Sequence, residues 1–341
     1  MLDKTGVQTS PGITRKPRPP RHSAFLNVGL NFTIHFEMLL KRLKASLGLK
    51  KTAVKQATVV LRKRRNNNHR GRHAEAQVQA LFLDYDGTIS PLNVLRSDSM
   101  VSPENMAVLH QISRQMPVAV ITTKDLSFVV KRTPFARAWS GLGGLEMKIG
   151  DVITRASCLR NMTSYLTTAL KYAKSLSGND LIIEEKRDSE GVVVAFSVDW
   201  RHAKNSCEAE ERALKIISYC ETLPVVTIKC ERQPFFDVFP CPVNKGKALL
   251  ELKQKLGLHN GILYMGDSNV DNAAFEVADI AVGVIHEETP DNLVCSYFVK
   301  FEDVVAFLKG LLKNSFRFSP KLPMILNRTQ AFQCIRGRKF T

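Results

Sequence analysis

The segment VQALFLDYDGT, residues 78–88, decides the fold of this chain. Its first six residues form a short, mainly apolar run, which is typical of a strand buried in a parallel sheet. Asp84 and Asp86 follow at once, and Gly87 permits a tight turn that aims both carboxylates at one point. Ligands bind at the carboxyl ends of parallel strands, so chemistry is expected here. The alternative is a strand that merely ends in an Asp-Gly turn.

The sequence on either side of this segment alternates between predicted helices and buried strands. Apolar spacing predicts a helix over 103–116, and short apolar runs predict strands at 117–121 and 135–140. The same alternation returns later, with strands at 262–265 and 280–284 and a last helix over about 301–312. This order indicates an α/β domain in which helices cover both faces of a parallel sheet.

A different pattern interrupts the alternation between residues 151 and 240. Apolar runs at 181–183, 191–198, 225–228 and 235–239 predict strands of an open antiparallel sheet, and 205–221 reads as a helix. We therefore expect an inserted α+β cap at 151–240 and a core domain built from 78–150 and 241–315. Residues 1–77 are expected to form a basic, disordered arm, and 316–341 a basic tail.

The charge of the chain is concentrated at its two ends. The net charge is +17. Residues 1–80 contribute +14, residues 316–341 contribute +6, and the body between them has a balance of −3. The arm could therefore bind weakly to an anionic surface. The chain has no run of 18 apolar residues, which argues against a membrane span. We expect a cytoplasmic protein, and organelle targeting by the basic N-terminus remains an alternative.

The seven cysteines are scattered along the chain and show no C-x-x-C spacing. An odd number without metal-ligand spacing argues against a zinc site and against a disulfide framework. This usage fits a reducing compartment.

Asp84 and Asp86 are suited to phosphoryl transfer. Asp84 can attack phosphorus and form an aspartyl-phosphate. Asp86 can protonate the leaving oxygen and then activate water for the second step.

A second acidic motif, MGDSNVD at residues 265–271, follows the predicted strand 262–265. Asp267 and Asp271 lie four residues apart at a strand-to-helix junction, so both can point toward one hard cation that prefers oxygen ligands. Together with Asp84 and Asp86 they are the predicted ligands of such a cation. The alternative is that Asp271 caps the following helix.

Two further motifs supply groups that could bind phosphate. Lys245 opens a predicted helix, where an ammonium group and the helix N-terminus both favour an anion. Thr122 follows the predicted strand 117–121 and can donate a hydrogen bond to a phosphate oxygen. Neighbouring Lys247 and Thr123 are the alternatives.

These four motifs, in this order, resemble the haloacid-dehalogenase (HAD) superfamily, which implies a Rossmann-like core, Mg²⁺ and a large cap between the Thr and Lys motifs. The resemblance favours Lys245 over Lys247. Within the superfamily, residues 82–91 and 266–275 are most similar to trehalose-6-phosphate phosphatases. The family's Ser-Gly-Arg is Thr-Thr-Lys at 122–124, and the histidine of its Gly-x-His-Gly-x-Glu is absent at 141–146. Sugar contacts are expected at Glu146, Glu185, Lys186 and Arg201, with ordinary surface residues as the alternative.

The sequence therefore predicts a Mg²⁺-dependent sugar-phosphate phosphatase, closest to a trehalose-6-phosphate phosphatase of trehalose biosynthesis. Within enzymes, the alternatives are a phosphatase for another sugar phosphate and a phosphomutase. A non-enzyme alternative is a nucleic-acid or membrane-surface binder with basic ends and an inactive HAD body. The expected partner is a small sugar phosphate with no obligatory nucleic acid, and the oligomeric state is left open.

Overall fold

The computed structural model describes residues 75–161, 163–287 and 289–337. All of them lie in the second of the two units into which the chain divides, 73–341. Almost all of the expected arm, 1–77, is outside the described residues, as are the expectations attached to it. No helix among the described residues is long and apolar enough to cross a membrane.

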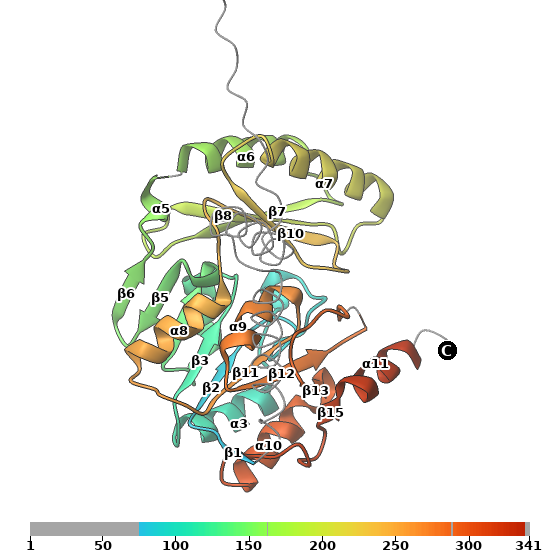
Figure 1. The fold of residues 1–341 in the computed structure, drawn as a ribbon. Coiled ribbons are helices and arrows are strands. Elements are labelled where there is room, and N and C mark those ends of the chain that lie inside the picture. The colour runs from blue at the N-terminus through green and yellow to red at the C-terminus, as the bar shows by residue number, and fades with distance from the viewer. Residues whose placement is uncertain (1–74, 162, 288, 338–341) are drawn as a thin grey trace, which may run out of the picture. The chain divides into compact units, whose positions relative to one another are not determined.

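A nine-stranded sheet forms the centre of the core domain (Figure 1). Its strand order is β15-β13-β12-β11-β2-β3-β4-β5-β6. The six inner strands, β13 to β4 in that order, pair in parallel. The outer strands β15, β5 and β6 pair antiparallel at the two edges. The strands are β2 (Ala80–Leu83), β3 (Val118–Ile121), β4 (Ala138–Gly141), β5 (Glu146–Ile149), β6 (Val152–Arg155), β11 (Ile262–Gly266), β12 (Ile280–Ile285), β13 (Tyr297–Lys300) and β15 (Leu326–Asn327).

Strand β2 shows why a continuous apolar run was the right signal. Leu81 and Leu83 pack into the apolar cluster on one face of the sheet, and Ala80 and Phe82 pack into the cluster on the other. A strand buried on both faces needs apolar residues at every position, because successive side chains point to opposite faces.

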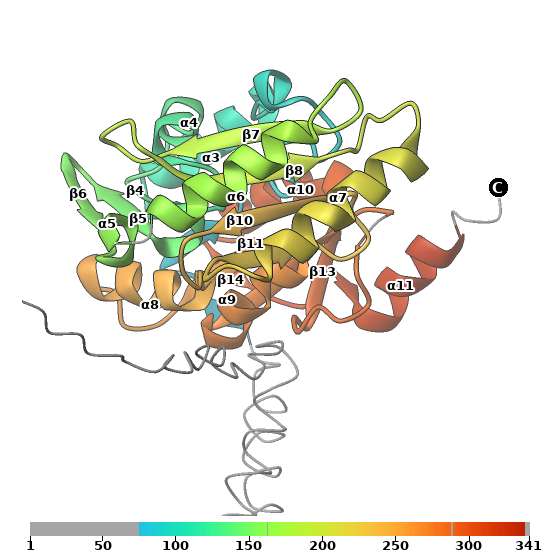
Figure 2. The same ribbon diagram turned by 90° about the horizontal axis from the view of Figure 1, so that it is seen from above.

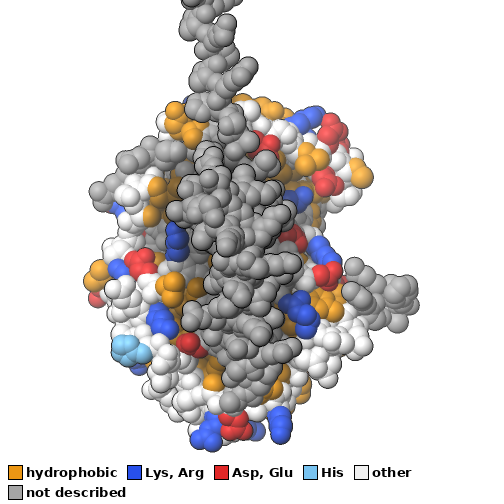
Figure 3. Space-filling model, in the orientation of Figure 1, with side chains coloured by type: hydrophobic (Ala, Val, Ile, Leu, Met, Phe, Trp, Pro, Cys, Tyr) orange, Lys and Arg blue, Asp and Glu red, His pale blue; other side chains and the backbone are white. Residues whose placement is uncertain are grey.

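Helices cover both faces of the core sheet. On one face lie α3 (Pro103–Ser113), α4 (Leu126–Arg132) and α10 (Val304–Lys313), and on the other α8 (Lys245–Lys255), α9 (Asn272–Val277) and α11 (Arg328–Gly337). Short 3₁₀ turns complete the core: η1 (Arg96–Asp98), η2 (Leu142–Gly144), η3 (Asn269–Asp271) and η4 (Phe301–Asp303). Charged side chains of both signs are interspersed where described residues are visible in Figure 3, in keeping with the near-neutral body.

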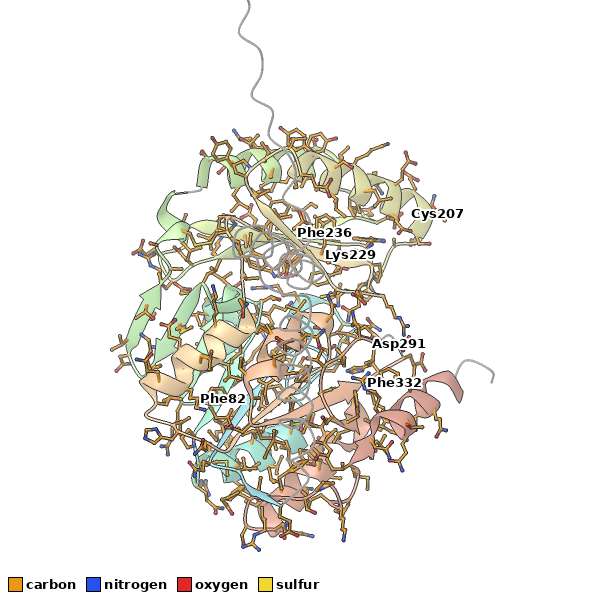
Figure 4. All side chains as sticks on the ribbon, in the orientation of Figure 1. Phe82, Cys207, Lys229, Phe236, Asp291 and Phe332 are labelled. Atoms are coloured by element: carbon orange, nitrogen blue, oxygen red, sulfur yellow. A yellow bond between two sulfur atoms is a disulfide. The ribbon has the colours of Figure 1, made fainter. Side chains whose placement is uncertain are left out.

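The cap is a four-stranded antiparallel sheet with helices on one face. Its strand order is β7-β8-β10-β9, and the strands are β7 (Ile182–Arg187), β8 (Val193–Asp199), β9 (Val226–Lys229) and β10 (Phe235–Phe239). Helices α6 (Thr163–Ser175) and α7 (Ser206–Cys220) pack on the sheet face turned away from the core, as Figure 2 shows from above. Phe236 lies inside the cap and Phe82 inside the core (Figure 4).

The structure moves two of the predicted domain limits. Strand β6 continues the core sheet, so the cap begins after Arg155 and not at residue 151. The expected tail folds onto the core: β14 (Arg317–Phe318) pairs with β1 (Ala76–Gln77), and α11 buries Ala331 and Ile335. These two residues lie four apart and so share one face of the helix. The basic residues around them hid this apolar spacing.

The expectation about cysteines also needs correction. Cys158 and Cys241 form a disulfide across 83 positions of sequence. Cys158 begins the short helix α5 (Cys158–Asn161), just after the chain leaves the core, and Cys241 lies where the chain returns from β10. The cap insertion brings these two crossings together, which spacing along the sequence could not reveal.

Candidate active site

A cleft of about 60 Å³ lies between the carboxyl ends of the core strands and the cap sheet. Most core residues that line it belong to the four predicted motifs, and cap residues come from three strands and two loops. The lining includes Asp84, Asp86, Thr122, Thr123, Lys124, Glu184, Lys186, Asp199, Arg201, Gln233, Phe235, Lys245 and Asp267.

Asp84 follows β2 and is almost fully buried at the floor of the cleft. Lys245 Nζ lies 2.8 Å from Asp84 Oδ1, and Lys245 is itself 3% exposed. Burial is the main cause that raises the pKa of Asp84 to about 7, and the ammonium of Lys245 opposes that shift. Lys245 thus holds one oxygen of the Asp84 carboxylate, and Asp84 is a buried, poorly solvated acid that lines the cleft.

Asp86 is more exposed than Asp84, with 29% of its side chain accessible to solvent. Its Oδ1 accepts a hydrogen bond of 2.9 Å from Ser99 Oγ, and Lys124 Nζ lies 3.7 Å from Oδ2. The turn after Asp86 requires glycine: Gly87 has φ +70°, and a Cβ there would lie 2.3 Å from Asp267 Oδ2. The tight turn therefore brings the first and last motifs into direct contact.

Three buried carboxylates meet beneath this turn. Asp84, Asp267 and Asp271 each offer an oxygen, and these oxygens lie within 4.8 Å of one another. Burial, and then the negative charges of Asp84 and Asp271, raise the pKa of Asp267 well above its usual value. The side chain of Asp267 accepts no hydrogen bond from the described residues. A hard divalent cation would relieve this repulsion, so the residues fit a metal site.

Asp271 has a different environment from the other two acids. Its Oδ1 accepts hydrogen bonds from Lys245 Nζ at 2.7 Å and from Tyr264 OH at 2.5 Å. Its Oδ2 accepts from the main-chain nitrogens of Asp267 at 3.2 Å and Ser268 at 3.1 Å. Both oxygens of Asp271 accept hydrogen bonds from the protein. Asp271 therefore fixes the positions of its neighbours in the site, and it does not line the cleft.

The predicted phosphate-binding groups lie beside Asp84. Thr122 is 1% exposed at the end of β3, and its Oγ1 accepts a hydrogen bond of 3.2 Å from the main-chain nitrogen of Lys124. Thr122 and Thr123 both line the cleft. Lys247 is exposed and does not line it, whereas Lys245 is buried in it. The structure thus places Lys245, and not its neighbour, against Asp84.

Two of the four expected sugar contacts lie outside the cleft. Glu146 is fully buried, and its Oε1 accepts hydrogen bonds from Ser189 N at 2.9 Å and from Ser189 Oγ at 2.6 Å. Glu185 forms ion pairs with Lys174 and Arg187 on the other face of β7. Neither Glu146 nor Glu185 lines the cleft, so their role as sugar contacts stays a prediction.

The other two expected contacts do line the cleft. Lys186 Nζ lies 2.5 Å from Asp237 Oδ1 and donates to Thr123 O at 3.1 Å, which joins cap to core. Arg201 pairs with Asp199 at 2.6 Å. It also donates a hydrogen bond of 2.7 Å to Leu92 O, which is a second link between cap and core.

Sequence reasoning missed Glu184, which lines the cleft and is bound by Arg96. Arg96 also binds Asp125, the N-cap of α4, so it links cap and core. The signal for Glu184 was present, because residues two apart on a strand share a face. Lys186 faces the cleft, so Glu184 does too and Glu185 does not.

The chain is similar to known trehalose-phosphate phosphatases. No family model matches the chain. A probable trehalose-phosphate phosphatase of rice (Oryza sativa subsp. japonica) is 27% identical over 263 residues, which cover 68% of this chain and 67% of the rice protein. A trehalose-phosphate phosphatase of Mycobacterium tuberculosis is 24% identical over 241 residues, 65% of this chain, and the chain spans only 58% of that protein's length.

A solved structure shows the same fold. The C-terminal domain of a Candida albicans trehalose-6-phosphate phosphatase superposes with a TM-score of 0.58 at 18% identity, covering 73% of this chain and 94% of that domain. The comparisons confirm the predicted HAD-like core with its cap, and they confirm the resemblance to trehalose-phosphate phosphatases. They also support the prediction of an enzyme, a phosphoric monoester hydrolase.

Proposed function

From this fold and this likeness to trehalose-phosphate phosphatases, we propose that the chain is a Mg²⁺-dependent sugar-phosphate phosphatase whose substrate is trehalose 6-phosphate. One observation carries the proposal. A buried nucleophilic carboxylate, an acid/base carboxylate, a cation and a further buried carboxylate converge on one small cleft: Asp84, Asp86, Lys245 and Asp267. Phosphate-monoester hydrolysis is among the slowest uncatalysed reactions, so such a concentration of charge is what its catalysis requires.

The reaction proceeds in two steps. Asp84 attacks phosphorus in line, so an Asp84–phosphorus bond forms while the phosphorus–oxygen bond to the sugar breaks. Asp86 gives its proton to the departing sugar oxygen. In the second step, Asp86 takes a proton from water, whose oxygen attacks phosphorus and releases phosphate and free Asp84. Lys245 and Thr122 offset charge on the phosphoryl oxygens throughout.

Mg²⁺ would be held by the carboxylates of Asp84 and Asp267 and by the main-chain carbonyl of Asp86, with Asp271 in support. When bound, it supplies positive charge against the phosphoryl oxygens. The repulsion among the buried acids is the feature of this chain that favours such an ion.

The cap must move for this substrate to enter. Pockets that bind small molecules enclose roughly 300–1,000 Å³, whereas this cleft encloses about 60 Å³. The hydrogen bonds from Lys186 to Thr123 O and from Arg201 to Leu92 O join the cap to the core. They would have to break when the cleft opens, after which Lys186, Arg201 and Glu184 can contact the sugar.

Phosphate release from a panel of sugar phosphates, with trehalose 6-phosphate among them, tests the proposal. We expect the highest kcat/KM for trehalose 6-phosphate and no release by Asp84→Asn. A higher value for another sugar phosphate would change the substrate and keep the reaction. A phosphomutase would release phosphate only slowly and would need a sugar bisphosphate primer. If no sugar phosphate is hydrolysed while the protein binds nucleic acid or anionic vesicles, the proposal is wrong.

A further inference from the structure

Ser99 lies outside all four motifs but contacts the acid/base. It follows η1, is 1% exposed, and its Oγ donates a hydrogen bond of 2.9 Å to Asp86 Oδ1. Ser90 Oγ lies 2.8 Å from Ser99 Oγ. A hydroxyl has a single proton, and that of Ser99 is directed to Asp86, so Ser90 is the donor in this pair. The three groups form a chain that runs from Ser90 through Ser99 to Asp86.

The backbone around Ser99 is fixed by groups from two other segments. Its carbonyl oxygen accepts a hydrogen bond of 2.7 Å from Tyr85 OH and one of 3.1 Å from Arg132 Nε. Tyr85 is fully buried and lies between the two aspartates in sequence. Ser99 is therefore anchored to the segment that carries Asp86, and its hydroxyl has little freedom to leave the carboxyl group.

This contact makes the two oxygens of Asp86 unequal. A carboxyl oxygen that accepts a hydrogen bond is the worse place for the acid proton, because the donor and that proton would compete for the same lone-pair region. Oδ1 accepts from Ser99, whereas Lys124 Nζ, at 3.7 Å, is too far from Oδ2 to donate a hydrogen bond to it, and Asp86 and Lys124 both line the cleft.

We propose that Ser99 is a positioning residue for Asp86: it occupies Oδ1, so that the proton given to the departing sugar oxygen is carried on Oδ2, which faces the cleft. This inference rests on the proposed phosphatase reaction. Ser99 touches neither the substrate nor the reacting atoms, and it acts only by fixing the direction of the carboxyl group.

The test compares two leaving groups in Ser99→Ala. A sugar alkoxide leaves only with a proton, whereas 4-nitrophenolate leaves without one. The ratio kcat/KM reports the steps up to the first irreversible one, here departure of the leaving group, and so excludes the second step, in which Asp86 acts on water. We expect kcat/KM for the sugar phosphate to fall about 10- to 100-fold, and that for 4-nitrophenyl phosphate to fall less than about threefold.

Ser140→Ala is the matched control. Ser140 is also fully buried, but its hydroxyl has no hydrogen-bond partner among the described residues. This variant should leave both values of kcat/KM unchanged. Thermal unfolding of each variant shows whether it is folded. If Ser99→Ala does not fold, Ser90→Ala is tested instead. This variant removes the hydroxyl that donates to Ser99, and we expect a smaller fall in kcat/KM that is again selective for the sugar phosphate.

The outcomes separate the two proposals. A loss confined to the sugar phosphate supports the role of Ser99. Equal losses for both substrates, or no loss, would overturn that role and leave the phosphatase assignment intact. A wild-type protein that hydrolyses neither substrate overturns the phosphatase reaction and the inference that rests on it.

Discussion

Lys245 Nζ lies 2.8 Å from Oδ1 of Asp84, the proposed nucleophile. The same ammonium lies 2.7 Å from Asp271 Oδ1, so one buried charge serves two carboxylates. Removing it leaves both acids buried without their partner, which is far more costly than losing an exposed ion pair.

Lys245→Met should therefore lose turnover and also lower the free energy of unfolding by about 3–5 kcal/mol. Denaturant unfolding without added metal measures the second effect. Lys247→Met is the matched control, because Lys247 is exposed two residues further along the same helix. Equal stability of the two variants would show that the buried pairing contributes nothing.

Asp84→Asn should abolish phosphate release and leave the protein folded. The amide has nearly the shape of the carboxylate but cannot attack phosphorus. It also removes one of three crowded buried acids, so the unfolding temperature should not fall. Asp98→Asn, at an exposed position after the same motif, should keep wild-type turnover. Turnover by Asp84→Asn within tenfold of wild type would contradict the assignment of the nucleophile.

Substitutions at Asp267 and Asp271 should have different effects on metal binding and on stability. Activity should require Mg²⁺, vanish with a chelator and be inhibited by excess Ca²⁺, which takes more oxygen ligands. Mg²⁺ should raise the unfolding temperature of the wild type. Asp267→Asn should lose that rise. Asp271→Asn should unfold at a lower temperature even without Mg²⁺, because its oxygens accept hydrogen bonds from Lys245 and Tyr264. Full activity after exhaustive chelation would refute the metal site.

The disulfide between Cys158 and Cys241 predicts a thiol count. The chain has seven cysteines, and two of them are paired, so the denatured protein should show five free thiols before reduction and seven after it. Reduction should lower the free energy of unfolding by about 2–4 kcal/mol, because the bond closes a long loop. Seven thiols before reduction would mean that the pair is not joined.

A shortened chain that begins at Ala74 should keep both its fold and its kcat/KM for a small sugar phosphate. All four motifs, and the pairing of β1 with β14, lie beyond that residue. Binding of the full chain to anionic vesicles or nucleic acid should weaken with salt and be largely lost on shortening, since residues 1–80 carry +14 of the charge. An insoluble or inactive shortened chain, beside an active full-length one, would assign the first 73 residues a structural role.

Local patterns in the sequence predicted the parts of this protein that depend on near neighbours. The run before Asp84 predicted β2, because a strand buried on both faces needs apolar residues throughout. The acids after β2 and β11 could be placed together, because adjacent parallel strands end at one edge of a sheet. The order of the motifs then predicted the HAD-like core and the position of the cap.

By itself, then, the sequence determined the core strands and predicted the candidate site and the class of reaction, since each follows from spacing over a few residues. Only the tertiary structure decided which distant side chains share the cleft. Docking of the cap turned the face of β7 that carries Glu184 and Lys186 toward the cleft, and the insertion of the cap brought Cys158 to Cys241. The loop after η1 brought Ser99 to Asp86. These contacts depend on how separate elements pack against one another, and no short sequence pattern encodes that packing.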